Sequence, residues 1–472
     1  MPIDYSKFDK LGESESDEEK ASGAQVEAED NAKLLAELPP DIPREFSLVL
    51  AARHGQTNVV EALLDARVSP NAVDPTGASP LLRSLEGGVS NRPCVELLLR
   101  RKAMVDQRSE AGDMPLSYAA EVGPNELLET LLQAGSPSKG VRGVALAAAS
   151  NAGNVAAARM LLDSCASLDG VDKEGRSSLQ AWVLRGDAGL ISELLEARAT
   201  PNIQDKQGKT PLAMAVKSGS VPLVEQLCAH SANLEAQLTD GRTPLVLASQ
   251  TRDVSLALTL CTTLLQARAQ VETADGVGRR PLTCAAAEGN VGVCKLLLEL
   301  RAPVDARGTA GGGGHSGVTA LSIAASTGDE ALVRALLDAK ACVDLVDERG
   351  CPPVMTAARQ GFAEVCRALL AAKACVDQEQ EGSAKTALLL AAGSGHATCC
   401  EELLAARADV EKASTLGAAA MHAAAANGHL AVSQLLLRAG ASAMQPGPSG
   451  QDAATLAENA GHSDLAAMLR AT

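Results

Sequence analysis

The chain has 472 residues, a net charge of −16, and 46% hydrophobic but only 1% aromatic residues. This charge and the scarcity of rings exclude a protein that mainly grips phosphate backbones or stacks bases. The sequence has no apolar run of about 18 residues, no apolar signal-peptide core at its start, and no CxxC pair among twelve cysteines, so we expect a protein of the cytoplasm or the nucleus with reduced thiols.

The first 41 residues form an acidic tail. Twelve acidic residues and four lysines give this segment a net charge of −8, half of the total. Such a segment buries too little apolar surface to offset its ordering entropy, so we expect disorder, with a short capping helix between Val26 and Leu38. Ser14 and Ser16 are each followed three residues later by an acid, the pattern that acid-directed kinases prefer, and are candidate phosphosites.

Residues 42–472 repeat with a period of 33. When the position of Thr210 is taken as an anchor, an equivalent residue recurs in thirteen repeats, and seven of the twelve intervals are 33 residues. The anchors are Phe46, Ser79, Met114, Val144, Ser177, Thr210, Thr243, Arg280, Thr319, Pro352, Thr386, Ala419 and Asp452.

Each repeat carries the same signals in the same order. An Asp-x-x-Gly turn, such as 172–175, leads into a Thr-Pro-Leu-like start, which favours a turn followed by a helix with proline at its first position. A glycine then precedes a second helix that ends in a Leu-Leu pair, such as 194–195. Small alanine pairs let neighbouring helices approach closely, which explains the missing rings. We predict an all-α solenoid of about thirteen helix-turn-helix repeats that are stabilised by stacking.

This pattern resembles the ankyrin-repeat family over residues 42–472. The resemblance implies short hairpin-like fingers between repeats and a concave face of fingers and first helices that binds a partner protein. A row of basic residues on the expected fingers, the finger cations, supplies candidate partner-binding residues. The finger cations are Arg176, Lys206, Lys209, Arg242, Arg279 and Arg280.

A second basic series departs from the family pattern. Ankyrin repeats usually end the second helix with a glycine in the left-handed conformation, whereas eight of twelve such positions are basic here. Five consecutive ones form the basic ridge: Arg268, Arg301, Lys340, Lys373 and Arg407. Two interpretations remain open, namely compensation of the helix macrodipole and docking of an acidic partner, including the chain's own tail.

Three repeats have irregular lengths. The long interval before Thr319 contains the glycine-rich run 308–317, which lacks a Gly-Lys-Ser/Thr motif and predicts a flexible finger extension rather than a nucleotide site. The interval before Val144 is short. Four extra residues follow Thr243, and we expect them in the segment between the two helices.

The cysteines and histidines indicate no catalytic, metal or cofactor site. Cys261, Cys294, Cys366 and Cys400 each precede a Leu-Leu pair by three residues, where other repeats have Val or Ile, so we expect them in the core. Cys342 and Cys375 fall in loops, and no ligand spacing typical of zinc occurs. The seven histidines are scattered, and only His422 occupies the histidine place of the family's Thr-Pro-Leu-His motif, where the resemblance implies a local bond that stabilises the turn.

We therefore expect a non-enzymatic scaffold or adaptor that is monomeric in isolation, with no nucleic acid or membrane as partner. The alternative is a phospho-regulated co-chaperone or inhibitor whose acidic tail competes for the basic rows. About the first 19 residues are similar to the N-terminal signature of the kinase-loading co-chaperone of the ninety-kilodalton heat-shock chaperone, although Phe8 stands where that family has Trp.

Overall fold

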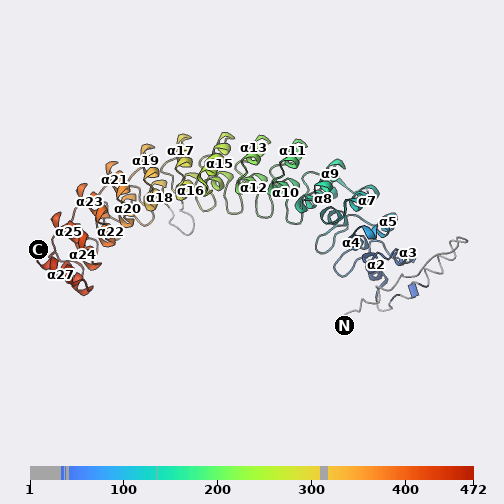
Figure 1. The fold of residues 1–472 in the computed structure, drawn as a ribbon, viewed down its shortest axis with the longest axis horizontal. Coiled ribbons are helices and arrows are strands. Elements are labelled where there is room, and N and C mark those ends of the chain that lie inside the picture. Colours follow the sequence, from blue (N-terminus) through green and yellow to red (C-terminus); the bar gives the residue numbers. More distant parts are fainter. Residues whose placement is uncertain are drawn as a thin grey trace. The chain divides into compact units, whose positions relative to one another are not determined.

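The computed structural model describes residues 42–135, 137–308 and 317–471, together with Lys33, Leu35, Ala36 and Leu38. Each repeat contributes two helices, a first helix with an even label and a second with an odd label (Figure 1). The first helices are α2 (Arg44–Arg53), α4 (Pro80–Glu86), α6 (Pro115–Glu121), α8 (Lys139–Ala152), α10 (Ser178–Arg185), α12 (Pro211–Ser218), α14 (Pro244–Ser249), α16 (Pro281–Ala287), α18 (Ala320–Thr327), α20 (Pro353–Gln360), α22 (Ala387–Ser394), α24 (Ala420–Ala426) and α26 (Ala453–Asn459). The second helices are α3 (Thr57–Asp65), α5 (Arg92–Arg100), α7 (Asn125–Gly135), α9 (Val155–Asp163), α11 (Ala188–Glu196), α13 (Val221–Ala229), α15 (Val254–Gln266), α17 (Val291–Glu299), α19 (Glu330–Asp338), α21 (Ala363–Ala371), α23 (Ala397–Ala405), α25 (Leu430–Arg438) and α27 (Ser463–Arg470). The predicted all-α array of about thirteen repeats is confirmed.

The anchors mark where the first helices begin. Eleven of the thirteen anchors immediately precede a first helix. Several cap that helix with a side-chain oxygen: Ser79 Oγ accepts a hydrogen bond from the Leu82 amide at 3.2 Å, and Asp452 Oδ1 accepts one from the Thr455 amide at 2.7 Å. The sequence register therefore predicts helix starts because it follows the capping residues.

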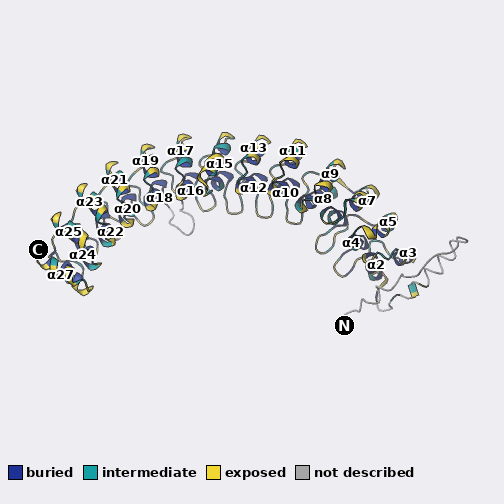
Figure 2. Ribbon diagram, viewed as in Figure 1, coloured by how far each residue is buried: buried dark blue, intermediate teal, exposed yellow. Residues whose placement is uncertain are grey.

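The core of each repeat lies between its two helices and those of the next repeat. The Leu-Leu pairs and the alanine pairs supply it, and Ala119, Ala120, Leu194 and Leu403 are all fully buried. Figure 2 shows buried residues between the two helix layers and exposed residues on the outer side of the second helices. Because small side chains fill this space, neighbouring helices pack closely without aromatic rings.

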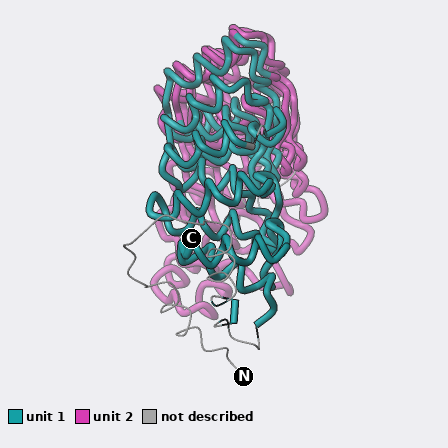
Figure 3. Tube along the Cα trace, turned by 90° about the vertical axis from the view of Figure 1, so that its right-hand side faces the viewer, with its two compact units in different colours: residues 1–218, 230–232 teal, residues 219–229, 233–472 magenta. Residues whose placement is uncertain are grey.

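The chain divides into two compact units, residues 1–218 with 230–232 and residues 219–229 with 233–472 (Figure 3). The division falls inside the sixth repeat, so α12 belongs to the first compact unit and α13 to the second. Among the described helices, none has both the length and the apolar composition that crossing a bilayer requires.

Two departures from the regular repeat are resolved by insertions in different places. In the second repeat, the 3-10 helix η2 (Gly88–Asn91) occupies the segment between the helices. In the repeat of Thr243, the prediction was wrong: α15 is 13 residues long, whereas α13 and α17 have nine, so the four extra residues add a turn to the second helix. Because the apolar and small residues of 254–266 continue the helical pattern, elongation satisfies their backbone groups within the helix.

The first and fourth repeats are the two whose anchors lie inside a helix. Phe46 lies in α2, where Leu38 and Phe46 pack against Ile42 and Leu50 at the start of the array. Val144 lies in α8, a first helix of 14 residues that begins after the capping residue Ser138. Residues 309–316 of the glycine-rich run lie outside the described residues, and Gly308 and Val318 bridge at its base.

Candidate functional site

The loops that join one repeat to the next are fingers, and a turn aspartate organises each of the regular ones. In the finger before α16, Asp275 Oδ1 accepts hydrogen bonds from the amides of Val277 at 3.0 Å and Arg279 at 2.8 Å. The Gly278 amide donates to the Asp275 carbonyl at 2.9 Å, and Gly278 has a φ of 85° that favours glycine. The same amide pattern recurs at Asp74, Asp172, Asp205 and Asp347. The fingers are therefore held by bonds within themselves.

Three of the six finger cations form ion pairs inside their own turn. Arg279 Nε lies 2.6 Å from Asp275 Oδ2, and that carboxylate is fully buried. The equivalent pairs are Arg176 with Asp172 at 3.1 Å and Arg242 with Asp240 at 2.7 Å. These arginines stabilise the finger and have little unpaired charge to offer a ligand.

The pKa values of the paired carboxyls follow their surroundings. The hydrogen bond from Arg242 lowers the pKa of Asp240, which is exposed. Burial raises the pKa of Asp172, and the bonds from Arg176 offset that burial only in part. Both carboxylates thus depend on the arginine of their own finger to stay charged in place.

The remaining finger cations are more available. Lys206 Nζ donates to the Lys173 carbonyl, and Arg280 Nη1 donates to the Glu272 carbonyl at 3.0 Å. The Lys209 side chain forms no ion pair with any acid among the residues that the structure describes. Lys206 and Lys209 lie in the first compact unit, whereas Arg280 lies in the second.

Apolar side chains at the finger turns are a feature that charge-based reasoning missed. In the second compact unit, Val277 is 59% and Leu416 is 75% exposed. In the first compact unit, Val73 is 48% and Val171 is 38% exposed. Each of these residues lies beside the turn aspartate or the turn glycine, so a Val or Leu at that place in the repeat is the signal that could have identified them. They offer apolar contact area on loops that are already ordered.

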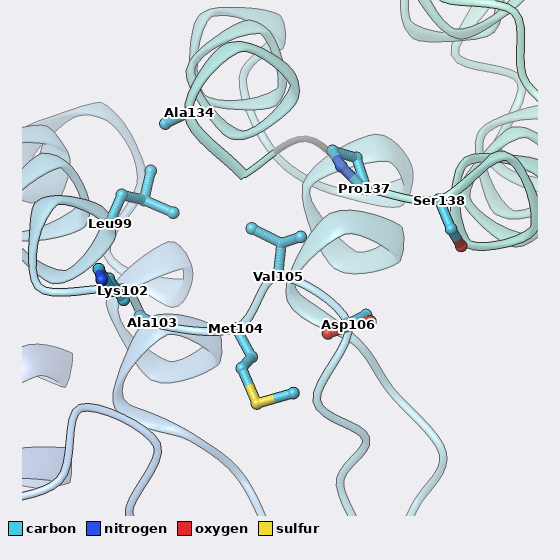
Figure 4. A pocket seen from close by; sticks show the side chains of 9 residues that line it. All are labelled: Leu99, Lys102, Ala103, Met104, Val105, Asp106, Ala134, Pro137 and Ser138. Carbon is cyan, nitrogen blue, oxygen red and sulfur yellow. The ribbon is translucent and has the colours of Figure 1, made fainter.

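The fourth repeat has no finger. Only residues 136–138 separate α7 from α8, so this connection is too short to form the turn found elsewhere. A hollow of about 320 Å³ lies here, between the chain around Lys102 and Met104 and the connection that contains Pro137 and Ser138 (Figure 4). The row of fingers in the first compact unit is therefore interrupted after the finger before α6.

All five residues of the basic ridge adopt the left-handed conformation, with φ between 64° and 75°. The amide of each ridge residue closes the second helix: that of Lys340 donates to the Leu337 carbonyl at 2.9 Å, and the next amide, of Ala341, donates to the Leu336 carbonyl at 3.0 Å. Gly440 occupies the same place in a later repeat with a φ of 92°. A side chain in this conformation costs about 1 kcal/mol, so each ridge residue is retained at some expense of stability.

The charges of the basic ridge are unpaired. All five side chains are exposed, and none forms an ion pair with an acid in the described ranges 42–135, 137–308 and 317–471. Several acids at the base of the fingers bind backbone instead: Asp305 accepts from the Cys342 amide and Asp344 from the Cys375 amide, both at 2.9 Å. We call these contacts inter-repeat carboxylate bonds. Pro303 occupies the corresponding donor position one repeat earlier and has no amide hydrogen.

His422 has the local role that the resemblance implies. It is 1% exposed, its Nδ1 accepts a hydrogen bond from the Ala419 amide at 3.2 Å, and its Nε2 lies 2.9 Å from the Gln445 carbonyl, to which it donates. Gln180 does the same in the fifth repeat, where its Oε1 accepts from the Ser177 amide at 2.7 Å. These side chains join the first helix to the finger beyond it and face no cavity.

Three other histidines belong to a row that sequence reasoning did not recognise. Each ring of the row covers a glycine of the preceding repeat, and a Cβ on that glycine would lie 2.5–2.7 Å from the ring. The pairs are Phe362 over Gly328, His396 over Gly361, His429 over Gly395 and His462 over Gly428. Their spacing of 33 or 34 residues was the available signal, and their role is packing between repeats.

The thiols have the burial that their repeat positions predict. Cys261, Cys294, Cys366 and Cys400 are fully buried, and burial raises the pKa of Cys294 to about 12. Cys342 and Cys375 are exposed, as expected for loop positions. Within the part of the chain that the structure describes, no group of three His, Cys, Asp or Glu side chains could hold a metal ion.

The predictions for the acidic tail fall outside the described residues. Ser14, Ser16, most of the predicted capping helix and the segment similar to the co-chaperone signature all lie there. Competition between the tail and the basic rows therefore stays a prediction.

Comparison with known proteins identifies the repeat. The family model described as "Ankyrin repeats (3 copies)" matches residues 48–142, 180–275, 257–347, 305–381 and 373–447, which together cover more than half of the chain. A segment of 91 residues, 19% of this chain, is 37% identical to the human "Neurogenic locus notch homolog protein 4". That segment spans only 4% of the notch protein's length.

Proposed function

This chain belongs to the ankyrin-repeat family, and we propose that it is a non-catalytic scaffold or adaptor that binds a partner protein on the face formed by its fingers and first helices. The observation that carries the proposal is the exposure of apolar side chains at finger turns, with Leu416 and Val277 as the most exposed of them. Contact residues of this kind act as anchors in protein interfaces when polar residues surround them.

The construction of the fingers supports the same proposal. The turn aspartates and the arginines that pair with them hold the fingers in place before any partner arrives. A preformed surface loses little conformational entropy on binding, so many modest contacts can add up to useful affinity. The ion-paired arginines act as supports in this proposal, and the apolar turns, Lys209 and Arg280 provide contacts.

The test is retention of proteins from the native cell on the immobilised full chain. In the finger variant, Val277→Asp and Leu416→Asp place charges on two turns of the second compact unit. In the control variant, Val254→Asp and Leu430→Asp place the same charges on exposed positions of second helices α15 and α25.

The proposal expects proteins that bind the wild type and the control variant and are lost from the finger variant. Circular dichroism establishes that both variants keep the helical array. Proteins lost from the control variant but kept by the finger variant would place the binding face on the second helices and contradict the proposal.

A further inference from the structure

We propose that the basic ridge is a second docking surface, which binds an extended acidic segment of a partner protein with an acid at every third residue. The ridge lies at the C-terminal ends of the second helices α15, α17, α19, α21 and α23, all within the second compact unit. It is separate from the finger turns and from the first helices, so it extends the proposed scaffold to a further surface.

The backbone conformation is the first step of the argument. Glycine fits the left-handed end of these helices without strain, and Gly440 shows that this array can use it. Five consecutive repeats nevertheless place Arg or Lys there with φ between 64° and 75°. Backbone strain of this kind persists where the surrounding structure supports it, and it gathers at functional sites.

The electrostatics is the second step. Compensation of the helix macrodipole is satisfied by a cation anywhere in the last turn, so it does not require the one position that strains the backbone. The five side chains are exposed and form no ion pair with a described acid, whereas the cations of neighbouring second helices do: Arg334 pairs with Glu330, and Arg367 pairs with Glu402 at 2.7 Å.

The acids near the ridge leave its charge available. Asp305 and Asp344 are committed to the amides of the next repeat. Glu299 and Asp338, two residues before Arg301 and Lys340, form no ion pair with a described residue. An incoming carboxylate can therefore approach each ridge cation without displacing an existing partner.

The repeat sets the pattern that the ridge can recognise. Neighbouring second helices pack about 10 Å apart, and an extended peptide advances about 3.3 Å per residue. One repeat thus corresponds to about three residues of an extended ligand, and five cations correspond to about 13 residues. An acid at every third position meets one ridge cation per repeat.

A nucleic acid fits this surface less well. A DNA strand carries a charge about every 3.4 Å, about three times the density of the ridge, so the additional phosphates would meet the intervening carboxylates. The chain contains only 1% aromatic residues, which leaves no platform for stacking bases.

The test is the affinity of the full chain for a fluorescent 15-residue peptide with Glu at every third position, measured by anisotropy at low and at physiological salt. The ridge variant carries Arg268→Gly, Arg301→Gly and Lys340→Gly, which remove charge while placing at each site the residue that suits its backbone. The control variant carries Arg252→Gln, Arg349→Gln and Arg359→Gln, three exposed cations of the same compact unit that lie off the ridge.

The proposal expects the ridge variant to bind the peptide about tenfold more weakly, with a flatter salt dependence, and the control variant to bind like the wild type. A peptide of the same composition with its five Glu residues adjacent should bind the wild type more weakly. Equal affinity of the ridge variant and the wild type would overturn the proposal. So would equal binding of the two peptides, or displacement of the spaced peptide by a single-stranded oligonucleotide of the same charge.

Discussion

Arg301 shows how one residue in this array carries two opposing effects. Its left-handed backbone is unfavourable for any side chain, while its charge lies near a helix C-terminus, where a cation contributes about 0.3–1 kcal/mol. A simple removal of the charge confounds these effects, but two substitutions at the same position separate them.

The Arg301→Gly variant is expected to be more stable than Arg301→Ala by about 1 kcal/mol, because both remove the charge and only glycine relieves the backbone. Urea unfolding of the two variants measures this difference. If alanine proved as stable as glycine, the ridge would carry no conformational cost, and that argument for its function would fail.

Asp74 gives the array a dependence on acid. It is buried, and although burial raises its pKa, the hydrogen bonds from Thr76, Ala78 and Arg83 lower it below its usual value of 3.8. A carboxyl whose folded-state pKa is lowered stabilises the folded chain above its ordinary pKa, and this contribution is lost as the pH falls below it.

The Asp74→Asn variant should therefore be less stable than the wild type at pH 7 and should lose less additional stability between pH 4 and pH 2. Thermal unfolding across this range makes the comparison. Asp106→Asn is the control, because the exposed Asp106 side chain forms no hydrogen bond with a described residue. Parallel pH profiles of Asp74→Asn and the wild type would contradict the assignment.

What the sequence reveals at this scale depends on whether a residue type has a single common role. Capping Ser and Thr residues and cysteines that replace Val have such roles, so the anchors and the buried thiols were predictable. Arg176 and Arg279 do not, because a basic residue on a loop can bind a ligand or a neighbouring acid with equal ease. Only the geometry shows that both pair with the aspartate four residues earlier.

Helix α8 shows how the loss of a finger changes an element. Its N-terminal extension approaches the next finger so closely that a Cβ on Gly143 would lie 2.6 Å from the Ser167 carbonyl oxygen. Gly140, three residues earlier in the same helix, is exposed, and a Cβ there would lie no nearer than 3.9 Å to its neighbours. The two glycines form a matched pair for mutation.

Gly140→Ala should stabilise the protein by about 0.5 kcal/mol because alanine is the better helix former, whereas Gly143→Ala should destabilise it by about 1–3 kcal/mol because the backbone it meets cannot move aside. Denaturant unfolding measures both. Stabilisation by Gly143→Ala would mean that α8 does not pack against residues 167–170 in this way.

The elements were predictable where the repeat is regular and not where its length changes. Period, turn signals and Leu-Leu pairs predict both helices of each regular repeat. The four additional residues of α15 have no marker that separates a longer helix from a longer connection, because apolar and small residues suit both. In the same way, the short interval before Val144 predicts a shortened repeat but not a first helix of 14 residues.

At the scale of the whole molecule, each repeat contacts its immediate neighbours. In the second compact unit, α19 packs on α21, α21 on α23 and α23 on α25. Stability in such an array is approximately a sum over repeats and the interfaces between them, so damage should stay local.

Leu403→Ala in α23 removes a fully buried side chain and should cost about 2–5 kcal/mol locally. Hydrogen exchange should show lost protection in α21 to α25 and little change in α15 and α17. The exposed Glu401→Ala in the same helix is the control. A uniform loss of protection across residues 233–471 would show instead that this compact unit opens as a single cooperative body.

Pro303 gives the longest finger an asymmetric attachment. That finger begins with Asp305, which reaches forward to the Cys342 amide, whereas Pro303 has no amide to receive Glu272 from the repeat behind. Load that a ligand places on this finger is thus carried toward the C-terminal repeats rather than shared equally with both sides. The join beside Pro303 is accordingly where the stack can bend to admit a bulky guest at the lowest mechanical cost.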